Sequence, residues 1–321
     1  MTGKYSITVD NNVLQYKFEI KRNITIIKGD SATGKTTLVD MIREHYENGD
    51  QSGVFLQCDK QCAVLEGRQW QTLLKGINDS IIFIDEGNPF ITSTDFAEAV
   101  SKSDNYFVIV TRESLSNLPF SVDEIYGIKS SGKYGSLTKT YQEFYNIYTK
   151  PEYDNFVPDV VIVEDSNSGY DFYAYINIGK DMKVESAGGK SGIFKMLGEI
   201  KDSKILIIAD GAAFGSEMDR IMKRIAIKGN TVLYLPESFE WLLLKSEIVK
   251  DSEIKEILMH PYDYIDSKDF MSWERFFSSL LIEKTKGTYL HYNKSELNEA
   301  YKTEKISSKI VDTMPKGIFG H

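Results

Sequence analysis

The sequence predicts an α/β protein with a mostly parallel sheet in each half and a helical C-terminal region. Short runs of β-branched and other apolar residues alternate with helical patterns along most of the chain, which is the order that parallel sheets require. A glycine-rich loop joins one of these runs, Ile24–Ile27, directly to a helical pattern. The length of 321 residues is enough for two domains with separate cores.

The first half of the chain opens with β structure. Residues 5–28 show the period of two of half-buried strands and end in the apolar run at residues 24–27. Residues 38–42 then carry the apolar spacing of a helix. Further strands are predicted at residues 54–57, 81–84, 106–110 and 124–128, separated by helical or irregular segments such as residues 95–102. We expect these elements to form a domain over residues 1–132.

Residues 133–157 are rich in tyrosine. We interpret this segment as the connection between two domains, with a packed helix around residues 139–148. We expect its aromatic rings to pack against a domain face rather than to stack on nucleic-acid bases.

The second half repeats a strand–helix unit four times and predicts a small, mostly parallel sheet over residues 158–250. Its strands are expected at residues 160–163, 182–185, 205–208 and 232–235, and its helices at residues 169–176, 192–199, 216–227 and 238–245. Residues 251–321 are predicted to be helical and polar, with a packing stripe formed by Trp273, Phe276, Phe277 and Leu280.

The composition excludes several classes of protein. The chain has 38 Lys and Arg against 47 Asp and Glu, a formal net charge of −9, which excludes a strongly basic nucleic-acid binder but not a local basic groove. Its two cysteines exclude a disulfide-built secreted fold, and they have too few partners for a zinc site. No apolar run approaches the roughly 18–20 residues of a membrane span. We therefore expect a cytoplasmic protein without a membrane partner.

Residues 29–36 match the P-loop pattern, Gly-x-x-x-x-Gly-Lys-Thr, in its strand–loop–helix context. Glycines allow backbone N–H groups to surround phosphate oxygens, and the start of the following helix adds positive charge. Lys35 is expected to reach the β- and γ-phosphates, and the Thr36 hydroxyl is expected to ligate Mg²⁺. The sequence thus predicts bound ATP and Mg²⁺, with the nucleotide held by Gly29, Asp30, Ser31, Ala32, Thr33, Gly34, Lys35, Thr36 and Thr37.

Two acids follow the apolar strand Ile81–Ile84 and complete the expected site. Asp85 is predicted to hold Mg²⁺, directly or through water, and Glu86 to orient and polarise the attacking water. An adjacent catalytic acid favours hydrolysis of ATP over phosphoryl transfer to a metabolite. The strand at residues 106–110 ends in Thr111 and Arg112. If that strand lies beside the P-loop strand, Thr111 can sense the γ-phosphate and Arg112 can stabilise charge; a surface arginine without nucleotide contact fits the sequence equally well.

These motifs carry a resemblance to a known family. Residues 5–115 resemble a reduced ATPase of the additional-catalytic-glutamate class of P-loop NTPases, and the β segment before the loop is similar to that of ABC-type ATPases. The chain has no LSGGQ-like signature, and Thr111 stands where those ATPases have a histidine. The resemblance implies ATP hydrolysis, and it makes a second copy of the chain a candidate partner because such ATPases often complete their site with a neighbour.

Acids also follow the strands of the second half, namely Glu164, Asp210 and Glu240. The ends of parallel strands gather at one sheet edge, where oxygen ligands suit Mg²⁺ or Mn²⁺ and chemistry on phosphate esters. The order of Glu164, a glycine turn at residues 188–190 and Asp210 resembles a degenerate Toprim domain. Ala212 replaces the second acid of its Asp-x-Asp motif, and Asp165 replaces a glycine. Glu217 and Asp219 can substitute only if their helix turns them inward.

An ATPase followed by a Toprim domain resembles the overcoming-lysogenisation-defect family of ATP-dependent nucleases. The resemblance implies metal ligation by Glu164 and Asp210, and DNA or RNA as partner. Our first hypothesis is ATP hydrolysis coupled to a domain that acts on or binds nucleic acid. The alternatives are a regulatory ATPase switch whose second domain is a non-catalytic interaction module, and a small-molecule kinase that uses the same P-loop.

Overall fold

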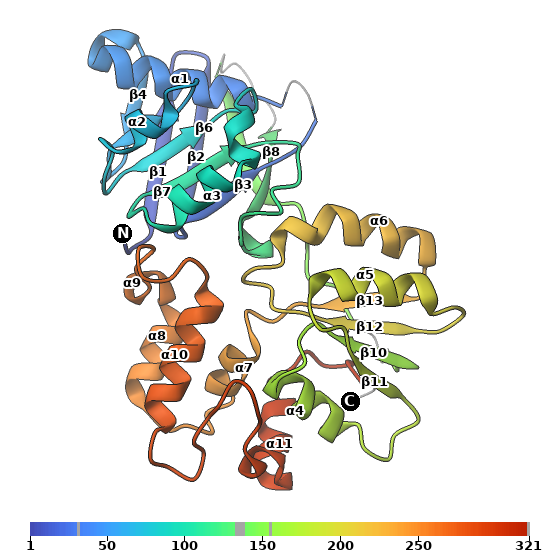
Figure 1. The fold of residues 1–321 in the computed structure, drawn as a ribbon. Coiled ribbons are helices and arrows are strands. Elements are labelled where there is room, and N and C mark those ends of the chain that lie inside the picture. The colour runs from blue at the N-terminus through green and yellow to red at the C-terminus, as the bar shows by residue number, and fades with distance from the viewer. Residues whose placement is uncertain (31–32, 132–138, 154–155, 320–321) are drawn as a thin grey trace. The chain divides into compact units, whose positions relative to one another are not determined.

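The computed structural model of the protein describes residues 1–30, 33–131, 139–153 and 156–319 (Figure 1). The chain divides into two compact units. Unit 1 comprises Met1–Thr149 and His260–Met271, and unit 2 comprises Lys150–Met259 and Ser272–His321. Each unit contains a β-sheet with helices, so the expected mixed α/β class is confirmed.

The described part of unit 1 contains a sheet with the strand order β4-β1-β2-β9-β8-β3-β7-β6-β5. Strands β8, β3, β7, β6 and β5 run parallel, whereas β1 pairs antiparallel with both β2 and β4. Every residue of β3, β6 and β7 is buried, as expected for central strands that are covered on both faces. The strands are β1 Tyr5–Asp10, β2 Leu14–Ile20, β3 Ile24–Ile27, β4 Phe55–Gln57, β5 Cys62–Val64, β6 Ile81–Ile84, β7 Tyr106–Val110, β8 Ile125–Ser131 and β9 Thr140–Asn146.

The helix expected around residues 139–148 is wrong, because β9 occupies this segment. β9 pairs antiparallel with β8 and parallel with β2, so its backbone groups bond on both sides. Its Phe144 ring stacks on Phe18 of β2 with the centroids 4.3 Å apart. The pairing with β2 joins parts of the chain that lie far apart in sequence, and it overrides the helical interpretation of a segment whose aromatic and β-branched residues also suit a strand. The predicted connection at residues 133–157 lies partly outside the described residues, which omit 132–138 and 154–155.

Helix α1, Lys35–Asn48, follows the glycine-rich loop and buries Leu38, Val39, Met41 and Ile42, as the apolar spacing predicts. The remaining helices of unit 1 are short: α2 Trp70–Leu74, α3 Thr94–Ser101, α9 Pro261–Tyr264, and the 3₁₀ turns η1 Gly49–Ser52, η2 Pro89–Thr92 and η3 Val122–Glu124.

The C-terminal region does not form one body, because His260–Met271 belongs to unit 1. The Gly3 N–H donates to the Tyr262 carbonyl at 2.6 Å, and the N-terminal ammonium pairs with Asp266 at 2.9 Å. The Asn23 amide donates to the Met271 carbonyl at 2.8 Å. These contacts fix a late segment of the chain to its first residues.

Unit 2 contains a parallel sheet with the order β11-β10-β12-β13, so the small parallel sheet is confirmed within the described residues. Helices α5 and α6 lie on one face of this sheet and α4 on the other (Figure 1). On α10, Trp273, Phe277 and Leu280 are buried, as predicted, and Phe276 is half-buried. The elements are β10 Val160–Val163, α4 Ser168–Ile176, β11 Lys183–Ser186, α5 Lys190–Glu199, β12 Ile205–Ile208, η4 Gly215–Glu217, α6 Met218–Lys228, β13 Thr231–Tyr234, α7 Phe239–Lys245, α8 Ser252–Met259, α10 Trp273–Thr285, η5 Glu299–Lys302 and α11 Glu304–Val311.

Gly192 in the first turn of α5 is required by a close backbone approach. A Cβ atom at this position would lie 1.8 Å from the Ala187 carbonyl oxygen. We expect Gly192→Ala to lower the free energy of unfolding by about 1–3 kcal/mol. Gly198 lies in the same helix, and a Cβ atom there would meet no heavy atom within 4 Å, so Gly198→Ala is the matched control and should stabilise by about 0.5–1 kcal/mol. Urea denaturation of both variants checks this, and equal midpoints would contradict it.

Candidate nucleotide site and acidic pocket

The loop between β3 and α1 has the backbone shape that its glycines permit. Gly29 and Gly34 have φ angles of +128° and +87°, a region that favours glycine. The Tyr16 hydroxyl of β2 donates to the Gly34 carbonyl at 2.8 Å, and a Cβ on Gly34 would lie 2.7 Å from that hydroxyl. Burial raises the pKa of Tyr16 to about 12, so this donor stays protonated. Of the predicted loop residues, Ser31 and Ala32 lie outside the described residues.

The Lys35 side chain is 5% exposed and turns back into the loop. Its Nζ donates to the Gly29 carbonyl and to Thr33 Oγ1, both at 2.9 Å, and also to the Asp30 carbonyl. Thr36 and Thr37 lie in the first turn of α1, and both residues are exposed. The ammonium therefore lies among loop oxygens, at the start of a helix whose first turn is accessible.

Asp85 and Glu86 follow β6 at the edge where the loop also begins. Strand β7 lies between β3 and β6, with Val110 paired to Ile27 and Ile109 paired to Ile84, so the carboxyl ends of all three strands are level. Residues 106–110 thus lie beside the strand that precedes the glycine-rich loop, which is the condition under which Thr111 and Arg112 could approach a bound phosphate. Burial lowers the pKa of Lys35, and the charges of Glu86, Asp30 and Asp85 act in the opposite direction. Both acids thus act electrostatically on the loop lysine.

Glu86 and Arg112 form a two-contact ion pair. Arg112 Nε lies 3.1 Å from Glu86 Oε2, and its Nη2 donates to Oε1 at 3.2 Å. The Arg112 charge also lowers the pKa of Lys35, which places this arginine near the loop. The Thr111 side chain is buried, and its hydroxyl oxygen accepts from the Glu113 N–H at 3.0 Å, so Thr111 organises the turn that carries Arg112.

The Asp85 carboxylate is only partly satisfied by hydrogen bonds within the described residues. Its Oδ1 is buried and has no hydrogen-bond partner among the described residues. A buried carboxylate oxygen without a donor is costly unless another positive group binds it. Carboxylate and hydroxyl oxygens, such as those of Asp85 and Thr36, are of the type that a hard divalent cation takes as ligands.

In unit 2, the acids Glu164 and Asp210 both line a pocket of about 150 Å³. The Asp210 N–H donates to Glu164 Oε2 at 3.3 Å, and the Phe239 N–H donates to Asp210 Oδ1 at 3.1 Å. Sequence reasoning missed the residues that reach the pocket from other elements. These are Tyr173 of α4, Glu274 of α10 and Lys294, whose Nζ lies 2.6 Å from Glu274 Oε1.

Burial controls the protonation of these acids. It raises the pKa of Glu164 to about 7, against the opposing charge of Lys190. It also raises the pKa of Asp210 well above its usual range, with a further contribution from the negative charge of Glu274. For Lys294 burial acts to lower the pKa, but the charges of Glu240 and Glu274 outweigh it and raise the value. The pocket is an acidic site with one internal cation.

Two other positions considered for this site, Glu240 and Ala212, are both buried. Glu240 is 2% exposed and accepts a hydrogen bond from the Tyr292 hydroxyl at 2.9 Å, so it is held in a buried polar contact. Ala212 is buried and supplies no acid. In the described parts of the chain, no three His, Cys, Asp or Glu side chains form a group that could hold a metal ion. The Tyr173 hydroxyl is buried, and it has no hydrogen-bond partner among those residues.

The raised pKa of Glu164 predicts that the free energy of unfolding falls as the pH rises. Because its folded pKa of about 7 lies above the ordinary 4.5, its contribution to stability is fully present below pH 4.5 and is lost as the pH rises through 7. Relative to Glu164→Gln, the wild type should lose at most about 3 kcal/mol of unfolding free energy over this window. Urea denaturation of both proteins with divalent cations chelated measures the difference in unfolding free energy. A constant difference from about pH 4 to 8 would contradict the assignment.

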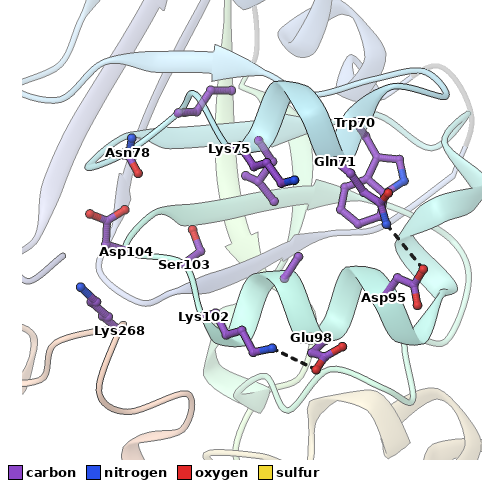
Figure 2. Close-up of a pocket in the computed structure, with 13 residues that line it drawn as sticks. Trp70, Gln71, Lys75, Asn78, Asp95, Glu98, Lys102, Ser103, Asp104 and Lys268 are labelled. Carbon is purple, nitrogen blue, oxygen red and sulfur yellow. Dashed lines mark hydrogen bonds and ion pairs between the residues drawn. The ribbon is translucent and has the colours of Figure 1, made fainter.

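A larger cavity of about 700 Å³ lies between α2 and α3 of unit 1, and Figure 2 shows its lining. Lys102 pairs with Glu98 at 3.0 Å, and Gln71 donates to Asp95 at 3.5 Å. Its lysines, Lys75, Lys102 and Lys268, are matched by three acids, Asp95, Glu98 and Asp104. The cavity contains none of the predicted site residues, and its balanced charge gives no preference for an anionic nucleotide.

Comparison with protein-family models gives no match, and no curated protein matches the chain. The chemistry of the two sites is therefore inferred from their own geometry. No helix of the described residues is long and apolar enough to cross a membrane.

Proposed function

We propose that unit 1 binds ATP with Mg²⁺ and hydrolyses it. The observation that carries the proposal is the position of the Lys35 ammonium inside the loop, within the electrostatic influence of Asp85, Glu86 and Arg112. Phosphate oxygens can replace the loop oxygens that now accept from Lys35, and N–H groups at the start of α1 add further donors.

Each residue of the proposed site has a distinct role. Residues 29–37 bind the phosphates, and Lys35 neutralises charge on the β- and γ-phosphates. Thr36 and Asp85 would hold Mg²⁺, which neutralises charge that develops on the phosphate oxygens when it is bound. Glu86 positions the attacking water and accepts its proton. Arg112 holds the Glu86 carboxylate through two contacts and adds positive charge near the loop.

The direct test is release of inorganic phosphate from ATP with Mg²⁺ present. We expect turnover that EDTA abolishes. The absence of phosphate release, with ATP bound or not, would contradict hydrolysis. Transfer of the phosphoryl group to an added metabolite instead would support the small-molecule kinase. We propose a cytoplasmic location, because ATP is available there. A second copy of the chain is the proposed oligomeric partner.

We further propose that unit 2 binds or acts on nucleic acid at the Toprim-like pocket. The observation that favours it is the hydrogen bond between Asp210 and Glu164 at the ends of neighbouring parallel strands. Glu164 and Asp210 are the residues that would hold Mg²⁺ or Mn²⁺. Their carboxylates suit these ions, but no third acid completes the group in the described residues, so the pocket alone does not define a metal-dependent cleavage step.

The nuclease form of this proposal has a clear test. With Mn²⁺, cleavage of DNA or RNA should be lost in Glu164→Gln while ATP hydrolysis in unit 1 persists. Equal cleavage by both proteins, or none by the wild type, would remove nuclease activity. In that case the regulatory switch stands, with unit 2 as a non-catalytic interaction module. The buried Ala212 and the ion pair of Lys294 with Glu274 favour that alternative.

A further inference from the structure

Helices α5 and α6 concentrate positive charge in a chain whose net charge is −9. Together they carry six Lys and Arg side chains and two acids. On α6, Arg220, Lys223 and Arg224 stand at positions i, i+3 and i+4, so they share one face of the helix. All three are exposed, and Lys195 is exposed on α5.

The two helices lie side by side on one face of the sheet (Figure 1). The Arg220 guanidinium lies 3.7 Å from the centroid of the Phe194 ring of α5. At the other end of α6, Lys228 Nζ donates to the Leu197 carbonyl at 2.8 Å. We call Lys195, Arg220, Lys223 and Arg224 the basic surface. Its Lys195, Lys223 and Arg224 make no ion pair with any residue that the structure describes.

Helix α5 begins next to Glu164, although none of the described residues that line the acidic pocket comes from α5 or α6. The Gly189 N–H, which precedes α5, donates to the Glu164 carbonyl at 2.6 Å. Lys190, the first residue of α5, donates to the Ala213 carbonyl, and its charge acts on Glu164. Helix α5 follows β11, and α6 follows β12, so both helices start at the edge where these strands end. The start of α5 is therefore the part of the two helices that contacts Glu164.

We propose that the basic surface binds the phosphodiester backbone of a nucleic acid. The inference rests on the proposed function of unit 2 and names its binding surface. Arg220 and Arg224 are about 6 Å apart along the helix axis, which allows contacts with successive phosphates. Acids elsewhere on the chain repel a polyanion and favour this face over others. No base contacts are implied, so binding should be largely independent of sequence.

An anionic membrane is the alternative partner that a basic helix could bind. Membrane binding needs a free apolar face, but Met218 and Ile221 of α6 are buried within unit 2. Two large apolar side chains of α6 are exposed, Ile227 at 84% and Met222 at 40%, but they lie five positions apart and form no continuous apolar stripe. Phosphodiester recognition accounts for the charges better than insertion into lipid.

The test compares two triple variants of the full chain. Lys195→Gln, Lys223→Gln and Arg224→Gln remove three unpaired cations of the surface and leave the Arg220 contact with Phe194 in place. Lys305→Gln, Lys309→Gln and Lys316→Gln remove three lysines elsewhere in unit 2 and change the net charge equally. Fluorescence anisotropy with labelled duplex DNA and single-stranded RNA, from about 50 to about 200 mM salt, gives the affinities.

We expect the surface variant to bind duplex DNA at least about tenfold more weakly at low salt, with a salt slope about 3 units shallower. The control should stay within about twofold of the wild type, and unchanged thermal midpoints show that both variants fold. The DNA and RNA arms identify which backbone is preferred.

Three results would overturn the proposal. If the wild type binds nucleic acid and the surface variant binds it equally well, the basic surface is not the binding site, but nucleic-acid binding by unit 2 is still supported. If the wild type binds neither nucleic acid, both the proposed surface and the proposed nucleic-acid function of unit 2 are contradicted. If the wild type binds only phosphatidylcholine vesicles that contain phosphatidylserine, and the surface variant does not bind them, the basic surface recognises lipid instead.

Discussion

Replacing Lys35 by alanine is expected to reduce kcat/KM for ATP hydrolysis by about 10²–10³-fold. The variant removes a cation that is 5% exposed and held inside the loop by Gly29 and Thr33. No other side chain of the loop carries positive charge, so the γ-phosphate would lose its main neutralising group in the transition state. The measurement is steady-state phosphate release, with ATP binding followed separately by calorimetry.

The matched control for Lys35 is Lys102→Ala, which removes an exposed lysine from its pair with Glu98 of α3. It should leave the rate within about twofold, because surface pairs contribute little. Thermal midpoints of both variants separate lost chemistry from lost folding. A Lys35→Ala protein that folds and hydrolyses ATP at the wild-type rate would show that the loop is not the site of the reaction.

Glu86→Gln is expected to lower kcat by about 10²–10⁴-fold while ATP binding changes little. Gln keeps the size of the side chain but cannot accept the proton of the attacking water. It also weakens the two-contact pair with Arg112, whose atoms lie 3.1 and 3.2 Å from the carboxylate. Binding and turnover should therefore separate in this variant, which is the signature of a group that acts in the chemical step.

Glu98→Gln is the control for Glu86, because Glu98 is a solvent-accessible acid that pairs with Lys102. Its kcat should match that of the wild type. If Glu86→Gln instead leaves phosphoryl transfer to an acceptor largely intact, the protein is a kinase and not a hydrolase. An equal loss of binding and turnover would assign Glu86 a structural role.

The strands that position the candidate nucleotide site could be predicted because their signals are local. Strands β3, β6 and β7 are continuous apolar runs, and the polar residues after them mark the sheet edge. The P-loop spacing located Lys35, and the parallel strands of unit 2 brought Glu164 and Asp210 together as expected.

The contacts that complete both sites could not be predicted, because they join distant parts of the chain. Tyr16 reaches Gly34 from β2, and Arg112 meets Glu86 across 26 residues. In unit 2, Glu274 and Lys294 enter the pocket from elements that follow the sheet. The strand β9 was missed for the same reason, since its pairing partners and not its own periodicity decide its conformation.

The central claim is hydrolysis of ATP at the loop of unit 1. The measurement that tests it most directly is phosphate release from ATP by the wild type and Lys35→Ala, with Mg²⁺ or Mn²⁺, in the presence and absence of DNA or RNA. We expect metal-dependent release by the wild type that Lys35→Ala nearly abolishes, and stimulation by nucleic acid if unit 2 is coupled to unit 1. No release by the wild type under any of these conditions, or equal release by both proteins, would contradict it.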